Sequence, residues 1–490
     1  MAATRDMTEG NITKSILFFA LPIFIGNIFQ QLYNVVDTAI IGNVLGDTSL
    51  AAVGASSSLY GLVIGFANGF SNGFSVVLAK YFGARDERQM KKAVALIYML
   101  SFTIAVALTI ISQIYLRPVL VWLKTPDTII DQTDAYMRII LLFVIVTIFY
   151  NMFSAILRAI GNSSTPLYFL ILSSLINVVL DIWFVKYLNM GVRGAGIATV
   201  ISQVVSVVLC IVYIYRKCPI LTLSIKDMRP EGTLTKELLS MGFSMMLMIE
   251  VVQIGSVALQ SAVNSLGEEI IAAHTAGRKV DEIFMMPFGA LTTACSTFTG
   301  QNYGAGNHER IQKGIRSGIG ISLCWAVFCI LCAFCFGLPI IRFISGSHNE
   351  QLLATALRYL RINIAFFPVL CFLLILRSCL QGVGHKIVPV CGSIVEMTLK
   401  FVAAGILTAQ LGYLGVCIIE PVTWCICAVM VIVDFGFFPK SHAKRTNACG
   451  VAKRLACVLL MFEHIEKQVA GMYGQYVRAF VFGHIAELFL

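Results

Sequence analysis

Charged residues are scarce in this sequence. Only 13% of its 490 residues are Asp, Glu, Lys or Arg, whereas 58% are hydrophobic and the mean hydropathy is +0.83. This composition excludes a soluble globular protein. Apolar runs of about 20 residues or more recur along the chain, and each is long enough to cross a hydrocarbon core about 30 Å thick. The sequence therefore predicts a multi-pass membrane protein.

The sequence also lacks the signatures of several enzyme classes. It contains no zincin H-E-x-x-H, no Walker A loop and no dinucleotide fingerprint. The stretch "GFSNG" (69–73) matches the nucleophile pattern G-x-S-x-G, but it lies inside an apolar run, where close helix packing explains its small residues better. We therefore expect no enzyme activity, no cofactor and no ATP-binding module. Transport would then be driven by an ion gradient or by the substrate's own gradient.

The apolar runs predict an all-α integral membrane fold with twelve spans. The expected spans are 15–42, 53–79, 93–116, 134–157, 167–188, 193–215, 237–263, 272–299, 314–340, 357–380, 389–410 and 413–437.

Lysine and arginine follow spans two, six and eight, whereas the loops after spans one, seven and eleven contain neither. The positive-inside rule then places both ends of the twelve-span core in the cytoplasm of a cell-membrane protein. We interpret the net charge of +10 as this topology signal and expect no nucleic-acid partner.

The chain contains an internal repeat. A constant shift that moves Val44 onto Ser265 places "VLGDTSLAAVGA" on "SLGEEIIAAHTA" and "YFGARD" on "NYGAGN", without a gap between them. Further on, "LRAIGNSSTP" matches "LQGVGHKIVP", and "GVRGAGIATV" matches "GYLGVCIIEP". Because the shift covers six spans, an even number, the repeat is parallel and predicts two six-helix bundles, as in secondary transporters.

The predicted domains follow from this repeat. They are an N-terminal lobe (1–215), a cytoplasmic linker (216–236), a C-terminal lobe (237–440) and an atypical tail (441–490) to which we assign no function.

Several of these segments together resemble the multidrug and toxic compound extrusion (MATE) transporters. The resemblance rests on "FQQLYNVVDTAIIG", "YFGARD", "GQNYGAGN", "NVVLD" and "GVRGAGIATVISQ", and it covers about residues 10–440. It implies twelve helices in two lobes and export of cationic or amphipathic compounds in exchange for protons or sodium ions.

Two aspartates inside the first half mark the candidate site. At about 1.5 Å per helical residue, Asp37, Asp181 and Thr199 lie at one depth, roughly 8–10 Å below the outer boundary. Asn177 precedes Asp181 by one turn on the same helical face. Such a cluster takes up a proton or replaces the hydration shell of a small cation. A structural role, with the acids hydrogen-bonded to neighbouring hydroxyls, is the alternative.

The resemblance implies cation binding at these four residues and helix bending at Pro22. It also matches Glu250 to an acidic coupling position, although coupling and structural roles are both open for that residue. We expect no metal other than sodium at the four-residue site. Under the shift that moves Val44 onto Ser265, Asp37 meets Ala258, so the second half is expected to lack a copy of the cluster.

Other polar residues inside the spans have two interpretations each. Gln30, Tyr33, Asn34 and Asn151 line a substrate cavity or hydrogen-bond between helices. Two pairs spaced by four residues, Glu396 with Lys400 and Arg278 with Glu282, are expected to neutralise themselves on one helical face.

The preferred function is an antiporter that exports toxic organic compounds by alternating access. Its partners are small-molecule substrates and the lipid bilayer, and it is expected to work as a monomer. The alternative is a lipid-linked oligosaccharide flippase of the same wider superfamily, which would favour a strongly cationic cavity. A membrane enzyme or receptor is a third class, disfavoured by the missing catalytic residues.

Overall fold

The computed structural model describes residues 6–223, 227 and 231–437, and every regular element in these ranges is helical. The predicted tail (441–490) lies outside the described residues. The helices are α1 (Ile12–Leu45), α2 (Asp47–Gly83), α3 (Glu87–Trp122), α4 (Asp127–Leu142), α5 (Val144–Ala159), α6 (Ser164–Asp181), the π-helix η1 (Ile182–Tyr187), α7 (Gly191–Lys217), the 3₁₀ turn η2 (Pro219–Leu221), α8 (Gly232–Asn264), α9 (Glu268–Gly304), α10 (His308–Ser345), α11 (Glu350–Ala365), α12 (Phe367–Gly382), α13 (Ile387–Leu411) and α14 (Tyr413–Phe437).

Each of the twelve predicted spans coincides with a helix or with a bent pair of helices. Within the described residues, 9 helices are long and apolar enough to cross a membrane, and two bent pairs, α4 with α5 and α11 with α12, each supply one more. Helix α9 coincides with the remaining predicted span, 272–299. Its 37 residues are long enough to cross, although charged residues in its first half lower its hydropathy and leave it outside the helices counted above.

The repeat is visible in the boundaries of the helices. The shift that moves Val44 onto Ser265 also moves both ends of α2 onto both ends of α9, and a shift longer by two residues moves the ends of α4–α5 onto those of α11–α12. The two bent pairs turn by 50° and 49° at Phe143 and Phe366, which occupy equivalent positions.

A pair of equivalent glycines shows the same agreement. Gly46 and Gly267, which precede α2 and α9, both have positive φ (82° and 96°), a conformation that glycine adopts without steric cost. The two halves therefore share their backbone geometry as well as their sequence pattern.

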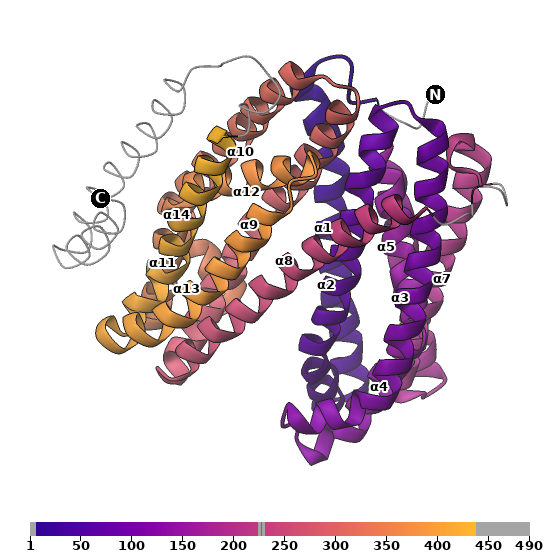
Figure 1. Cartoon of the computed structure of the whole chain (residues 1–490). Helices are drawn as coiled ribbons and strands as arrows, with labels where there is room; N and C mark the ends of the chain where they lie inside the picture. Colours follow the sequence, from indigo (N-terminus) through magenta and orange to yellow (C-terminus); the bar gives the residue numbers. More distant parts are fainter. Residues whose placement is uncertain (1–5, 224–226, 228–230, 438–490) are drawn as a thin grey trace. The chain divides into compact units, whose positions relative to one another are not determined.

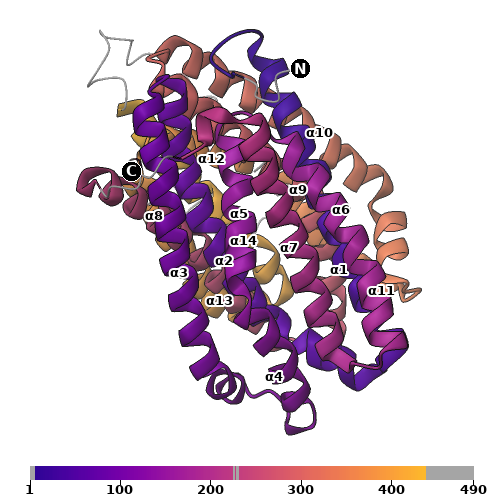
Figure 2. The ribbon, with the colours of Figure 1, turned by 90° about the vertical axis from the view of Figure 1, so that its right-hand side faces the viewer.

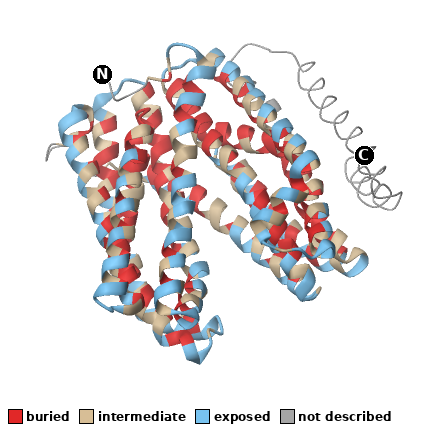
Figure 3. Ribbon diagram, turned by 180° about the vertical axis from the view of Figure 1, so that it is seen from behind, coloured by how far each residue is buried: buried red, intermediate tan, exposed pale blue. Residues whose placement is uncertain are grey.

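The packing divides the chain into two compact units. Unit 1 contains Met1–Glu250, Thr293–Gly314 and Gln381–Lys386; unit 2 contains Val251–Thr292, Ile315–Leu380 and the chain from Ile387. Figures 1 and 2 show α1, α2, α3, α5 and α7 of unit 1 as neighbouring, roughly parallel helices. Buried residues occur along the length of the helices (Figure 3). Since unit 1 includes segments from the second half of the repeat, the predicted lobe boundaries at 215 and 237 stay a prediction.

A row of glycines on α2 packs directly against α8. A Cβ atom added at Gly73 would lie 2.5 Å from Gly242 Cα, and one at Gly69 would lie 2.7 Å from the backbone nitrogen of Met246. Both glycines belong to the "GFSNG" stretch. Small residues at four-residue spacing allow two helix backbones to approach closely, so the packing role predicted for this stretch is confirmed.

The segment that precedes α1 is anchored to unit 1. Met7 is fully buried; its backbone N–H donates to Gln301 Oε1 (3.0 Å) and its carbonyl accepts from Asn302 Nδ2 (3.1 Å). Arg310 donates to the carbonyls of Met7 (3.2 Å), Glu9 (2.6 Å) and Gly10 (2.9 Å). The anchor therefore joins the start of the chain to the end of α9 and the beginning of α10.

Candidate functional site

The four residues of the predicted site lie together in the first half. Asp37 comes from α1, Asn177 and Asp181 from α6, and Thr199 from α7, and their exposed fractions are 8%, 1%, 0% and 5%. With its amide oriented to satisfy both neighbours, Asn177 donates to Asp181 Oδ2 (2.8 Å) and accepts from the backbone N–H of Thr199 (3.2 Å). We call these four residues the acidic cluster.

The two carboxyl groups of the acidic cluster lie close enough to interact directly with each other. Two ionised carboxylates that lie close together repel each other, so a shared proton or cation stabilises the pair. In the described part of the chain, Oδ1 of Asp37 and Oδ1 of Asp181 have no hydrogen-bond partner, and no lysine or arginine acts on either group. The cluster therefore has acceptor oxygens and negative charge available for a proton or a small cation.

Hydroxyl and amide groups surround the acidic cluster. Tyr33 Oη lies 3.4 Å from Thr199 Oγ1, and Tyr60 lies close to Gln203 and Asp37. Tyr136, which is 7% exposed, lies close enough to interact electrostatically with both aspartates. Tyr60, Tyr136 and Gln203 were not predicted, because nothing in their sequence context distinguishes them from other uncharged polar residues in apolar runs.

A π-helix follows the cluster directly. Asp181 ends α6, and the next six residues, Ile182–Tyr187, form η1. The stretch from Ser164 to Gly191 is two residues longer than its counterpart from Ile387 to Gly412. Insertions of this kind often form π-helical turns at functional positions. This local change in helix geometry distinguishes the first half from the second at the position of the site.

The other predicted site residues are not part of the acidic cluster. Gln30 and Asn34 are exposed on α1, and Asn151 donates to the carbonyl of Thr147 on its own helix (2.9 Å). Pro22 lies inside α1. Glu250 is half-buried on α8, beside Gly65, and its Oε1 has no hydrogen-bond partner within the described residues.

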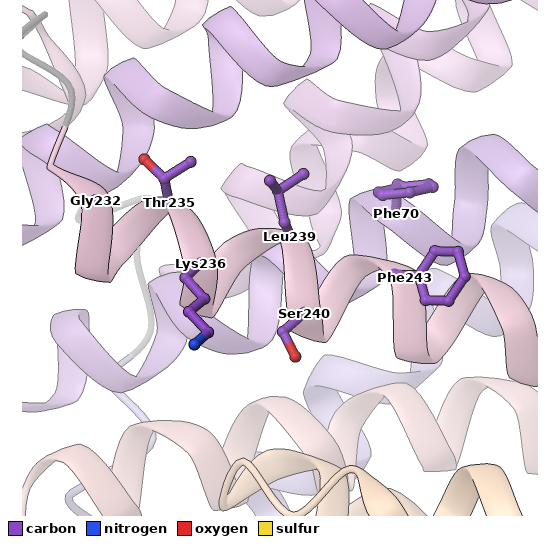
Figure 4. Close-up of a pocket in the computed structure, with 7 residues that line it drawn as sticks. All are labelled: Phe70, Gly232, Thr235, Lys236, Leu239, Ser240 and Phe243. Atoms are coloured by element: carbon purple, nitrogen blue, oxygen red, sulfur yellow. The ribbon is translucent and has the colours of Figure 1, made fainter.

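A groove of 740 Å³ lies at the beginning of α8, outside the acidic cluster. Figure 4 shows Phe70 of α2 near Leu239 and Phe243, with Lys236 and Ser240 pointing to one side of α8. None of the predicted cavity residues lines this groove.

The two charge pairs predicted inside spans both form: Lys400 Nζ lies 3.2 Å from Glu396 Oε1, and Arg278 Nε lies 3.3 Å from Glu282 Oε1.

Comparisons with known proteins identify relatives over most of the chain. A profile of the MatE family matches residues 22–183 and 242–406. The chain is 30% identical over 417 residues to the probable multidrug resistance protein YpnP of Bacillus subtilis, covering 84% of this chain and 92% of YpnP. It is 26% identical over 448 residues to the probable multidrug resistance protein YoeA of the same organism, covering 89% and 95%.

A solved structure has the same fold. It is described as the outward-facing conformation of a multidrug resistance MATE family transporter of the MOP superfamily, and it superposes with a TM-score of 0.83 at 24% identity. The match covers 90% of this chain and 98% of that one. The predicted all-α membrane fold of twelve helices is thereby confirmed.

Proposed function

Because this chain belongs to the MATE family, whose members are membrane transporters and not enzymes, we propose that it exports organic cations, drugs or other amphipathic toxic compounds in exchange for an ion. The relatives named above as multidrug resistance proteins support this substrate class. The proposed coupling ion is H⁺ or Na⁺, and transport proceeds by alternating access without a cofactor.

The acidic cluster is the observation that carries this proposal. Two buried carboxyl groups lie close to each other, keep two oxygens without partners in the described chain and have no cationic side chain acting on them. A charge buried in this way in a membrane bundle is costly unless an external proton or cation neutralises it. Asn177 donates to Asp181 and accepts from the backbone N–H of Thr199, so these two residues hold Asp181 in position.

Coupling requires that the ion binds the two access states unequally. Asp37 lies on α1 together with Pro22, where the missing amide donor allows a helix to bend. We propose that proton or cation binding between Asp37 and Asp181 changes the bending of α1 and so competes with substrate binding. Glu250 is proposed as a further coupling residue.

The proposed substrate cavity is lined by Gln30, Tyr33, Asn34 and Asn151. Their amide and aromatic groups suit chemically varied amphipathic ligands. The proposed location is the cell membrane, with both ends of the twelve-span core in the cytoplasm, two lobes joined by the linker 216–236, and a functional monomer.

Efflux of ethidium from proteoliposomes tests the coupling. The parent protein is compared with Asp37→Asn under an imposed proton gradient and, separately, an imposed sodium gradient. We expect efflux under one gradient and its loss in Asp37→Asn. Asp131→Asn is the matched control, because Asp131 is an exposed carboxylate paired with Arg117; its efflux should equal that of the parent.

Gradient-driven efflux that survives in Asp37→Asn would refute the coupling role of the acidic cluster. Absence of efflux under either gradient would favour the flippase alternative and a lipid substrate. A flippase for a pyrophosphate-linked lipid requires cationic groups in its cavity, whereas the acidic cluster contains two carboxyl groups. This difference in charge favours the antiporter.

A further inference from the structure

The second half contains a buried charge cluster of its own. Glu396 and Lys400 of α13 and Glu420 of α14 are 6%, 2% and 8% exposed. Lys400 Nζ lies 3.2 Å from Glu396 Oε1 and 3.6 Å from Glu420 Oε1, so one ammonium group lies between two carboxylates. We call these three residues the lysine cluster.

The groups around the lysine cluster complete its hydrogen bonds and charge balance. Tyr359 Oη donates to Glu420 Oε2 (3.3 Å), and Arg377 Nη1 lies 3.6 Å from Glu396 Oε2. Gly255 of α8 provides room for the lysine stem, because a Cβ atom there would lie 3.1 Å from Lys400 Cδ. Three residues of α9 also interact electrostatically with Glu420: His274, Arg278 and Asp281.

The repeat places the lysine cluster at the position of the acidic cluster. The shift that moves Gly46 onto Gly267 applies to α2 and to the start of α7, and the shift that moves Phe143 onto Phe366 applies from α4 to α6. With these shifts, the equivalent polar pairs are Tyr60 and Asp281, Tyr136 and Tyr359, Ser173 and Glu396, Asn177 and Lys400, and Thr199 and Glu420. The acidic cluster has no copy in the second half, since the equivalent of Asp37 is apolar, but other equivalent positions carry charge.

The two clusters differ in the origin of their positive charge. In the first half, no lysine or arginine of the described chain acts on Asp37 or Asp181. In the second half, the amine of Lys400 lies where a bound cation would lie between two acids. We propose that Lys400 is a tethered cation that fills the second-half counterpart of the ion site, so that only the first-half site exchanges its ion.

This proposal rests on the proposed function of the acidic cluster, but the role of Lys400 can be tested independently of it. Without the ammonium group, Glu396 and Glu420 contribute two negative charges, Arg377 contributes one positive charge, and Arg278 is paired with Glu282 (3.3 Å). The negative charge of the two carboxylates then exceeds the positive charge available to them, and a monovalent cation can neutralise the excess. The carboxylate oxygens and the hydroxyl of Tyr359 are ligands of the type that hard cations bind. Removing the amine should therefore create a sodium site.

The test measures whether sodium stabilises a variant that lacks the amine. The background is Asp37→Asn with Asp181→Asn, which removes both carboxylates of the acidic cluster. Thermal unfolding of purified protein is followed in sodium chloride and in choline chloride, at equal ionic strength and fixed pH. We expect no difference between the two salts for the background protein. Adding Lys400→Met should raise the unfolding midpoint in sodium by about 1 °C for each tenfold increase in concentration above Kd.

Two matched variants identify the source of the effect. Lys400→Arg keeps a cation between the acids, so it should show no preference for sodium. Lys400→Met combined with Glu420→Gln removes one of the two carboxylates, so the sodium effect should disappear. Recovery of folded Lys400→Met in sodium but not in choline would support the proposal as well.

Equal stability, or equal loss of folded protein, in the two salts for Lys400→Met would overturn the proposal and leave Lys400 as a structural ion-pair partner. A sodium-specific shift already present in the background protein would also overturn it, because the second half would then bind an exchangeable ion beside Lys400. Failure of the proposed function would be seen instead as unchanged efflux in Asp37→Asn, in an assay that does not involve Lys400.

Discussion

Helices α2 and α9 meet backbone to backbone at two equivalent glycines, and this contact gives a quantitative prediction. A Cβ atom at Gly83 would lie 2.6 Å from Gln301 Cα, and one at Gly304 would lie 2.8 Å from the carbonyl carbon of Lys80. One shift moves Gly83 onto Gly304 and Lys80 onto Gln301, so the crossing is symmetric with respect to the repeat. Non-bonded carbon atoms are most stable at about 3.5–4.0 Å. The alanine variant Gly83→Ala therefore requires the backbones to separate by about 1 Å.

We expect Gly83→Ala to destabilise this crossing by about 1–3 kcal/mol, the usual cost of overpacking a close contact. Gly61→Ala is the matched control, because it lies on the same helix and its added Cβ atom would have no neighbour within 4 Å. Replacing an unhindered helical glycine with alanine should stabilise by about 0.5–1 kcal/mol.

Hydrogen exchange of the amides near residues 80–84 and 301–305 measures the effect locally. A cost of about 1–3 kcal/mol corresponds to exchange about 5- to 150-fold faster in Gly83→Ala, where exchange follows local opening. Gly61→Ala should leave these amides at the rates of the parent. If the two variants exchange at the same rate, the two backbones do not meet as closely as described, and the reasoning is refuted.

Three further variants test individual contacts. Asn177→Ala should abolish ion-coupled efflux and lower stability by about 1–3 kcal/mol, because Asp181 loses its buried donor; thermal unfolding and the efflux assay measure the two effects. Arg310→Ala should release the anchored segment before α1, seen as faster proteolysis and amide exchange at residues 6–10. Lys80→Ala should cost less than about 1 kcal/mol, and the cost should shrink in high salt, because its ion pair with Glu237 is partly exposed; unfolding at two salt concentrations checks this.

Hydropathy predicted the helices well but could not predict the two breaks within them. The spans 134–157 and 357–380 were predicted as single helices, whereas each belongs to a pair bent by about 50°. The first break occurs at Phe143, which has no proline or glycine beside it, and the second occurs at Phe366, two residues before Pro368. The backbone angles of Phe143 (φ −104°, ψ 20°) differ from those of an α-helix, so the helix ends there. A hydropathy average depends only on side-chain polarity, so it cannot predict a change in backbone angles.

The candidate site was partly accessible to sequence reasoning. Counting helical rise placed Asp37, Asp181 and Thr199 at one depth, and the structure brings these residues together; their role in coupling stays a prediction. Of the lysine cluster, the pair of Glu396 and Lys400 was predicted from its spacing, but Glu420, on the next helix, was not linked to it. The equivalence of the two clusters was not predicted, because the shift between the halves changes along the chain. Helix α10 is two residues longer than α3, which changes the shift before α4, and the π-helix η1 changes it again before α7.

The repeat preserves backbone geometry more strictly than it preserves chemistry, and the reason is physical. A positive φ at Gly46 and Gly267, or a backbone contact at Gly83 and Gly304, excludes side chains by steric overlap, so the same residue type occurs in both halves. A buried polar site must meet only the weaker condition that its charges and hydrogen bonds are satisfied. An internal lysine satisfies this condition as well as an external ion does. The two halves bend at equivalent positions, and under the roles proposed for the two clusters only the first half depends on an ion from outside.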